Sequence, residues 1–160
     1  MSLVLTSNAF DHGAPIPSRY TCAGGDISPP LQWQGVPSKA RSLALVMDDP
    51  DAPDPRAPKM TWVHWVLYNI PPETGALREA ATSGNLPPGS AEGINDWHRV
   101  CYGGPCPPIG RHRYYIRLYA LDTMLEGLQR PTKAQLKAAM AGHCLAEAEL
   151  MGTFEQAKSG

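Results

Sequence analysis

Four titratable side chains lie in or beside strand-like segments of the sequence: Asp49, Asp51, His64 and His112. Imidazole N–H groups donate hydrogen bonds to the oxygens of a small anion, and carboxylates orient imidazoles or accept from a protonated ligand. Because an ordinary histidine has a pKa of about 6.5, such a site should gain affinity for an anion as the pH falls from about 7 to 6. The residue types therefore predict a pocket for a small anion.

The two-residue period of a β-strand can turn three of these groups toward one interior. Asp49 falls on the face of Met47, and His112 falls on the face of Ile116, and both neighbours have core character. His64 lies among aromatic residues in the middle of its own segment. Each group alone is more often a hydrogen-bonded core histidine or a turn-capping acid. Adjacent Gly/Pro loops favour ligand binding, because such loops hold backbone amides in fixed positions.

Three segments have the apolar, β-branched and aromatic composition of strands. They are residues 42–49, 61–70 and 112–121. Proline and glycine interrupt regular ladders, so we expect residues 50–58 and 102–110 to form ordered loops. The candidate ligand-binding residues lie in these strands or where the loops meet them.

The remaining segments predict one long loop, one helix and one further strand. Residues 73–96 are polar and rich in glycine and proline, with one short helical turn expected at 77–81. A helix is predicted with Thr132 as N-cap, a glutamine three residues later and Gly142 at its end. Residues 143–154 have helical composition but alternate in polarity, which favours a strand.

Strand-like segments that follow one another, with a single late helix, favour a mainly β, antiparallel fold over a doubly wound one. A chain of 160 residues has the usual size of one domain and is long enough to bury a continuous core. We therefore expect a single domain over residues 1–160.

The composition argues against several classes of partner and cofactor. Lys and Arg total 14 against 15 Asp and Glu, which leaves no overall positive field for nucleic acid or a membrane surface. The first ten residues lack the pattern of a signal peptide or membrane span, so we expect a cytoplasmic protein without integral membrane contact. The sequence has four cysteines, Cys22, Cys101, Cys106 and Cys144. Because they lack paired CxxC spacing, we expect free thiols, no metal site and no cofactor.

Six motifs, taken together and in order, resemble one known family. They are DISPPLQW (26–33), DDPDAP (48–53), TWVHWVLYNIP (61–71), YGGPCPP (102–108), HRYYIRLYALD (112–122) and AAMAGHCLAEAELMGTF (138–154). On these residues the sequence resembles the phosphatidylethanolamine-binding protein family, most closely its bacterial Raf-kinase-inhibitor-like branch. The resemblance implies two antiparallel β-sheets packed together, with a small pocket for phosphate-, acetate- or phosphoethanolamine-like ligands.

The resemblance also assigns particular residues to that pocket. Carried over position by position, they are Asp49, Asp51, Pro53, Trp62, His64, Gly104, Pro105, His112 and Tyr114. Two positions depart from relatives: Val63 replaces a histidine that animal members carry beside the pocket, and Arg111 belongs to a different spacer before His112. We expect Arg111 to alter ligand preference.

An enzymatic alternative uses Cys106 as nucleophile, His112 as base and Asp49 as the group that orients the base, as in a hydrolase. Against it, Cys106 lies between prolines, with no helix N-terminus to lower its thiol pKa. A structural role, as a small buried hydrophobic residue or as a partner for Cys22, is therefore favoured over catalysis.

A regulatory alternative also follows from the resemblance, since some family members bind kinases or other signalling proteins through the surface around the pocket. The resemblance to bacterial members also suggests a homodimer. An outward-facing aromatic pair, Tyr115 and Tyr119, offers a patch for it, although ordinary sheet packing explains the pair equally well.

Overall fold

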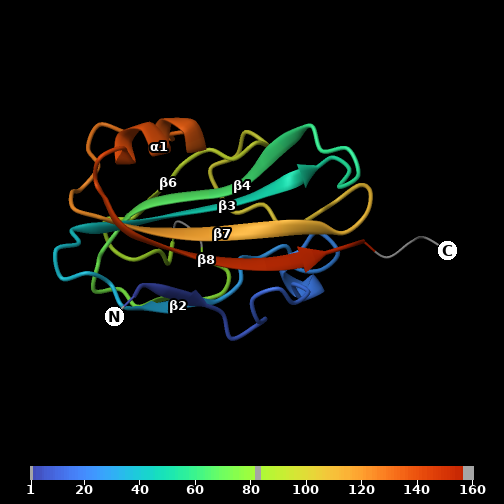
Figure 1. The fold of residues 1–160 in the computed structure, drawn as a ribbon, viewed down its shortest axis with the longest axis horizontal. Coiled ribbons are helices and arrows are strands. Elements are labelled where there is room, and N and C mark those ends of the chain that lie inside the picture. Colours follow the sequence, from blue (N-terminus) through green and yellow to red (C-terminus); the bar gives the residue numbers. More distant parts are fainter. Residues whose placement is uncertain (1, 82–83, 157–160) are drawn as a thin grey trace.

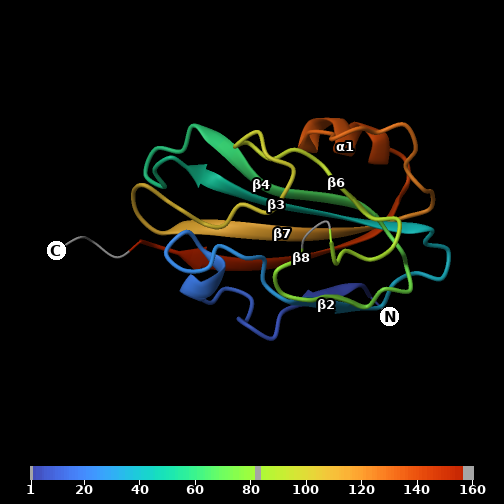
Figure 2. The same cartoon turned by 180° about the vertical axis from the view of Figure 1, so that it is seen from behind.

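Two antiparallel β-sheets pack face to face in the computed structural model, which describes residues 2–81 and 84–156 (Figures 1 and 2). The smaller sheet has the order β1-β2-β5, formed by β1 (Val4–Thr6), β2 (Leu31–Gln34) and β5 (Ala76–Leu77). The larger sheet has the order β6-β4-β3-β7-β8, formed by β6 (Ala91–Glu92), β4 (Met60–Ile70), β3 (Ser42–Ala52), β7 (His112–Leu121) and β8 (Cys144–Phe154). A 3-10 turn (Ser18–Tyr20) and helix α1 (Lys133–Met140) are the helical elements of the described ranges. The predicted mainly β, antiparallel fold is confirmed.

Strand β3 is buried on both faces because it occupies the centre of the larger sheet. Leu45 and Met47 belong to the core between the two sheets, whereas Ala44 and Val46 belong to a second core beneath α1. This burial on both sides explains why the segment reads as a continuous apolar run. The same alternation brings Asp49 to the end of the core between the sheets.

Helix α1 covers the outer face of the larger sheet, on the side away from β2 (Figure 1). Thr132 is its N-cap, and a capping box joins the Thr132 and Gln135 side chains to each other's backbone N–H groups. Leu136 and Met140 are buried against the sheet, and Gly142 follows the helix with a φ of 82°. The helix predicted from Thr132 is therefore confirmed, as is the final strand, which forms β8.

The short helical turn predicted at residues 77–81 is wrong. Leu77 pairs with Leu31 as part of β5, and its side chain is buried in the core between the sheets. Ala80 has a φ of 57°, a left-handed conformation that a helix does not continue through. Burial of Leu77 and pairing with β2 therefore outweigh the local helical composition.

The prediction that Tyr115 and Tyr119 form an exposed aromatic patch on the outer face of the sheet is also wrong. Tyr119 is only 3% exposed and lies in the core beneath α1, where Lys137 Nζ donates to its hydroxyl. Tyr115 lies under the guanidinium groups of Arg113 and Arg117. Helix α1 and the two arginines thus occupy the face on which the patch was expected.

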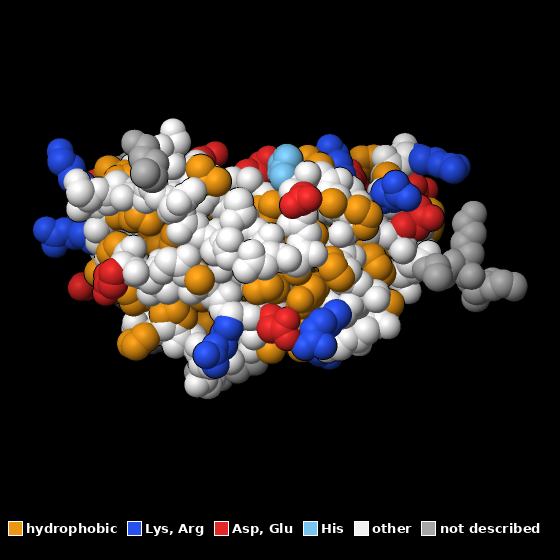
Figure 3. Space-filling view, turned by 90° about the horizontal axis from the view of Figure 1, so that it is seen from below, with side chains coloured by type: hydrophobic (Ala, Val, Ile, Leu, Met, Phe, Trp, Pro, Cys, Tyr) orange, Lys and Arg blue, Asp and Glu red, His pale blue; other side chains and the backbone are white. Residues whose placement is uncertain are grey.

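The described residues include no helix long and apolar enough to cross a membrane. Viewed from the side of the smaller sheet, basic and acidic side chains lie scattered, mostly around the edge, and do not gather into a basic face (Figure 3). This distribution agrees with the near balance of charges in the sequence.

Candidate functional site

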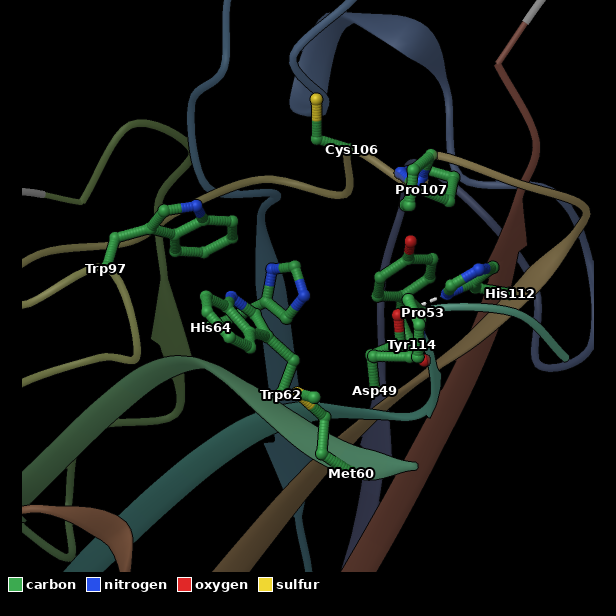
Figure 4. A pocket seen from close by; sticks show the side chains of 12 residues that line it. Asp49, Pro53, Met60, Trp62, His64, Trp97, Cys106, Pro107, His112 and Tyr114 are labelled. Carbon is green, nitrogen blue, oxygen red and sulfur yellow. Dashed lines mark hydrogen bonds and ion pairs between the residues drawn. The ribbon is translucent and has the colours of Figure 1, made fainter. Parts of the chain in front are cut away.

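A cavity of about 340 Å³ opens at the end of the larger sheet where β3 ends, β4 begins and β7 begins (Figure 4). Its walls also include two loop segments, around residue 97 and over residues 106–108. The lining residues are Asp49, Ala52, Pro53, Met60, Trp62, His64, Trp97, Cys106, Pro107, Pro108, His112 and Tyr114. The set contains no lysine or arginine, so an anion held here meets neutral donors.

Six of the nine residues assigned to the pocket line this cavity: Asp49, Pro53, Trp62, His64, His112 and Tyr114. Strand alternation had placed Asp49, His64 and His112 toward the interior, and all three are buried. They come from β3, β4 and β7, which are neighbours in the sheet although up to 63 positions apart in sequence.

Asp51, Gly104 and Pro105 do not line the cavity, contrary to their assignment. The Asp51 carboxylate accepts from Arg113 Nη2 at 2.8 Å and from the Arg113 backbone N–H at 2.8 Å, and these contacts lower its pKa. Gly104 donates its N–H to Asp26, and the Pro105 carbonyl accepts from the Cys22 N–H. These three residues therefore hold the rim in place rather than face the ligand space.

Asp49 and His112 form a hydrogen-bonded pair that is almost completely buried. His112 Nδ1 lies 2.6 Å from Asp49 Oδ2, and His112 Nε2 donates to the Ile109 carbonyl at 2.8 Å. Asp49 Oδ1 accepts the backbone N–H of Asp51 at 2.7 Å. Burial raises the pKa of Asp49, against the opposing effect of the His112 hydrogen bond. Because both imidazole nitrogens are engaged, the expectation that His112 donates directly to a bound anion is wrong.

His64 is buried beneath the cavity, and its ring lies between those of Trp97 and Tyr114 (Figure 4). Its Nδ1 is 2.7 Å from the Gly103 carbonyl, which can only accept, so Nδ1 carries the proton. Burial lowers the pKa of His64 to about 4, so the ring is neutral near pH 7 and Nε2 is an acceptor. Nε2 has no hydrogen-bond partner among the described residues. An imidazolium at His64 therefore cannot be the cause of the affinity gain expected between pH 7 and 6.

Two buried hydrogen-bond donors on the cavity wall lack a partner within the described chain: the Tyr114 hydroxyl and Trp62 Nε1. Figure 4 shows the Tyr114 hydroxyl directed into the space between His64 and Pro107. Burial raises the pKa of Tyr114, so its hydroxyl remains a donor at neutral pH. A buried donor without a partner costs about 1–3 kcal/mol, so both groups are suited to a ligand oxygen.

Sequence reasoning missed the apolar part of the wall, which includes Met60, Trp97 and Pro107. Trp97 is held by a turn in which the Asn95 side-chain oxygen accepts the backbone N–H groups of Trp97 and Arg99. An Asn two residues before a Trp is a weak signal for such a turn, and Met60 carries none. Val63, the noted departure from animal relatives, packs in the core beneath α1.

The expectation of free thiols is wrong for Cys22 and Cys106, which form the disulfide that was the alternative for Cys106. Cys101 and Cys144 are the free cysteines of the described chain. The disulfide joins the segment after the 3-10 turn to the cavity rim, where Tyr102 Oη also donates to the Tyr20 carbonyl. A disulfide sulfur has no thiolate to act as a nucleophile, so the hydrolase alternative built on Cys106 is not supported.

No group of three or more His, Cys, Asp or Glu side chains that could hold a metal ion occurs within residues 2–81 and 84–156.

The chain is similar to known proteins over almost its entire length. The family model described as phosphatidylethanolamine-binding protein matches residues 6–155. A UPF0098 protein of Methanothermobacter thermautotrophicus is 50% identical over 153 residues, which cover 95% of this chain and 98% of that protein.

Two solved structures share the architecture over almost the entire chain. A putative phosphatidylethanolamine-binding protein homologue, CT736 from Chlamydia trachomatis, is 44% identical, with a TM-score of 0.89 and coverage of 98% of this chain and 99% of that one. YbcL of E. coli, described as a new member of the mammalian PEBP family, is 30% identical, with a TM-score of 0.88 and coverage of 98% of this chain and 100% of that one.

Removal of the disulfide should destabilise the protein. Cys22 and Cys106 are 84 positions apart. A cross-link over a loop of this length reduces the conformational entropy of the unfolded chain and so raises its free energy by about 4 kcal/mol. A Cys22→Ala/Cys106→Ala variant should lose free energy of unfolding on that scale in urea titrations, whereas Cys101→Ala/Cys144→Ala should not. Thiol titration of the native protein should find two reactive thiols; four would contradict the disulfide.

Stability should fall in mildly acidic solution because of His64. Its folded-state pKa of about 4 lies below the value of about 6.5 in the unfolded chain, so between these values the unfolded state binds more protons. Stability present above pH 6.5 is therefore lost as the pH falls, by about 2 kcal/mol at pH 5. Urea unfolding at pH 7 and pH 5 should show a smaller loss for His64→Gln than for wild type, and equal losses would contradict the burial of a neutral imidazole.

Proposed function

Since the chain belongs to the phosphatidylethanolamine-binding protein family, we propose that it binds a small phosphate- or carboxylate-bearing ligand in the cavity of Asp49, His64 and Tyr114. The observation that carries this proposal is the pair of buried, unpartnered donors on the wall, Tyr114 Oη and Trp62 Nε1. Folding has removed both from water without giving either a protein acceptor. An oxyanion supplies acceptors to both and offsets the cost of their desolvation.

His64 adds a requirement for a ligand that carries its own proton. With Nδ1 donating to Gly103, the neutral ring offers a lone pair at Nε2, which accepts from an O–H group. A phosphate monoester in its singly protonated form presents two acceptor oxygens and one O–H, whereas a protonated carboxyl group presents one carbonyl oxygen and one O–H. The cavity therefore favours the monoanion of a phosphate group over the dianion.

The Asp49–His112 pair makes this preference possible without repelling the ligand. His112 Nε2 carries a proton because it faces a carbonyl, and one further proton lies between Nδ1 and Asp49 Oδ2. Whichever of the two atoms holds that proton, the pair as a whole has no net charge. The buried carboxylate thus does not confront the anion with an unbalanced negative charge.

Charge balance supports the same preference. The lining set lacks a Lys or Arg to neutralise two negative charges, and the walls contributed by Pro53, Met60 and Trp97 are apolar. Burial of a charge in such surroundings is costly, and the cost rises with the charge. A ligand that enters as a monoanion, with its apolar part against these walls, meets the lower cost.

Tyr114→Phe should weaken ligand binding without weakening the fold. The substitution removes one hydrogen bond to a charged group, so phosphoethanolamine should bind about tenfold less tightly in a calorimetric or NMR titration. The free energy of unfolding should stay the same or rise, because the hydroxyl that is lost has no partner in the ligand-free protein. Tyr115→Phe, whose hydroxyl lies outside the cavity, is the matched control and should retain wild-type affinity. Unchanged affinity in Tyr114→Phe would argue against this cavity as the binding site.

Affinity for phosphoethanolamine should rise as the pH falls because the ligand itself gains a proton. The second pKa of a phosphate monoester is about 6, so its monoanion population increases about 25-fold between pH 7.5 and pH 5.5. Sulfate, which remains a dianion over this range, should gain much less. A comparable rise for sulfate would instead place the titrating group on the protein.

A further inference from the structure

A second hollow, a groove of about 660 Å³, lies directly beside the cavity. It runs between the loop around residues 54–56 and the loop at residues 107–111, with Glu155 and Gln156 along one side. Pro107 and Pro108 line both hollows, so the groove and the cavity adjoin at these two prolines. All these segments meet at the end of the larger sheet where β8 ends (Figure 1).

Two arginines line the groove and are free to bind a ligand. Arg56 and Arg111 are exposed, and neither guanidinium has a hydrogen-bond or ion-pair partner in the part of the chain that the structure describes. Arg113 and Arg117, which lie on the outer face of the sheet, are instead bound to carboxylates. Nothing in the groove's own structure therefore occupies the two guanidinium groups.

The groove is not a strong site for a free anion, because it also contains two acids. Asp54 accepts the backbone N–H of Arg56 at 3.0 Å, and Glu155 faces the same hollow. The four charges cancel formally. A weak attraction of this kind becomes effective for a group that is already held nearby, since tethering raises its local concentration into the millimolar range.

The surface between the two hollows is apolar. Pro107 and Pro108 form the shared wall, and Ile109, at 55% exposed, continues it into the groove. A ligand that crosses from the cavity to the arginines therefore passes over hydrocarbon rather than over polar groups. Three surfaces therefore follow one another: the neutral cavity with its hydrogen-bond donors, the apolar surface of Pro107, Pro108 and Ile109, and the two guanidinium groups.

We propose that Arg56 and Arg111 form a second binding subsite for the far end of an elongated ligand that has an acidic group at each end and an apolar middle. This inference rests on the proposed function, because one acidic end must first be held in the cavity. The guanidinium groups then bind the other end with charge-assisted hydrogen bonds. Arg111, which belongs to a spacer that differs from that of relatives, would then help to select ligands by their length.

The test compares alkane-α,ω-bisphosphonates of increasing chain length with alkylphosphonates of the same length, by calorimetric titration. At one chain length the bisphosphonate should bind about tenfold more tightly than its monophosphonate partner. That gain should disappear in Arg56→Gln/Arg111→Gln, whose affinity for inorganic phosphate should match that of wild type. Arg41→Gln/Arg78→Gln removes the same charge from exposed sites outside both hollows and should keep the gain.

Two further measurements sharpen the interpretation. The gain should shrink as salt is raised, because the arginines are exposed and their interaction is screened. Glu155→Gln should increase it, since an opposing charge is removed from the groove. The absence of a gain at every length, or a gain that survives in Arg56→Gln/Arg111→Gln, would overturn the second subsite while leaving phosphate binding intact. Failure of phosphate and of every phosphonate to bind would overturn the proposed function, and this extension with it.

Discussion

The buried hydrogen bond between Asp49 and His112 is the contact on which the geometry of the site depends. It joins the end of β3 to the start of β7, and each partner uses its remaining polar atom to fix a loop. His112 Nε2 binds the Ile109 carbonyl and so positions the loop before β7, whereas Asp49 Oδ1 binds the Asp51 N–H and positions the turn that leads to Pro53. Two segments of the cavity wall are thus fixed by one pair, whose shared proton leaves it without net charge.

The third wall is held from a different part of the chain. The segment after the 3-10 turn is joined to the rim by the Cys22–Cys106 disulfide and by the hydrogen bond from the Gly104 N–H to Asp26. The neighbouring Gly103 carbonyl determines which nitrogen of His64 bears the proton. A contact made for the rim therefore decides whether the cavity presents a donor or an acceptor to its ligand. Structural and chemical roles cannot be separated at this position.

Strand periodicity predicted the inward direction of Asp49, His64 and His112, and capping chemistry predicted α1. The same period places Asp51 on the face of Asp49, but the pairing of β3 with β4 shifts register between Asp49 and Ala52, and Asp51 turns outward to Arg113. Hydrogen-bond partners could not be predicted, because the Ile109 and Gly103 carbonyls reach the histidines only through the folded loops. The Cys22–Cys106 pairing could be raised only as an alternative for a similar reason: cysteine spacing in sequence does not encode contact across 84 positions.

A cavity without cations has a consequence for selectivity. Most anion sites gain affinity from fixed positive charge, which attracts every anion in proportion to its charge. In this cavity the polar atoms without a hydrogen-bond partner in the described chain are neutral, namely the Tyr114 hydroxyl, Trp62 Nε1 and His64 Nε2. Neutral donors and acceptors discriminate by the position of oxygens and protons, so the proposed site would select a ligand by its protonation state more than by its charge. The charged groups stand outside, at Arg56 and Arg111, where water and salt weaken them for free anions. Under the proposed function, this division would make the cavity select the protonation state of the bound acidic group, while the groove would select the length of the rest of the ligand.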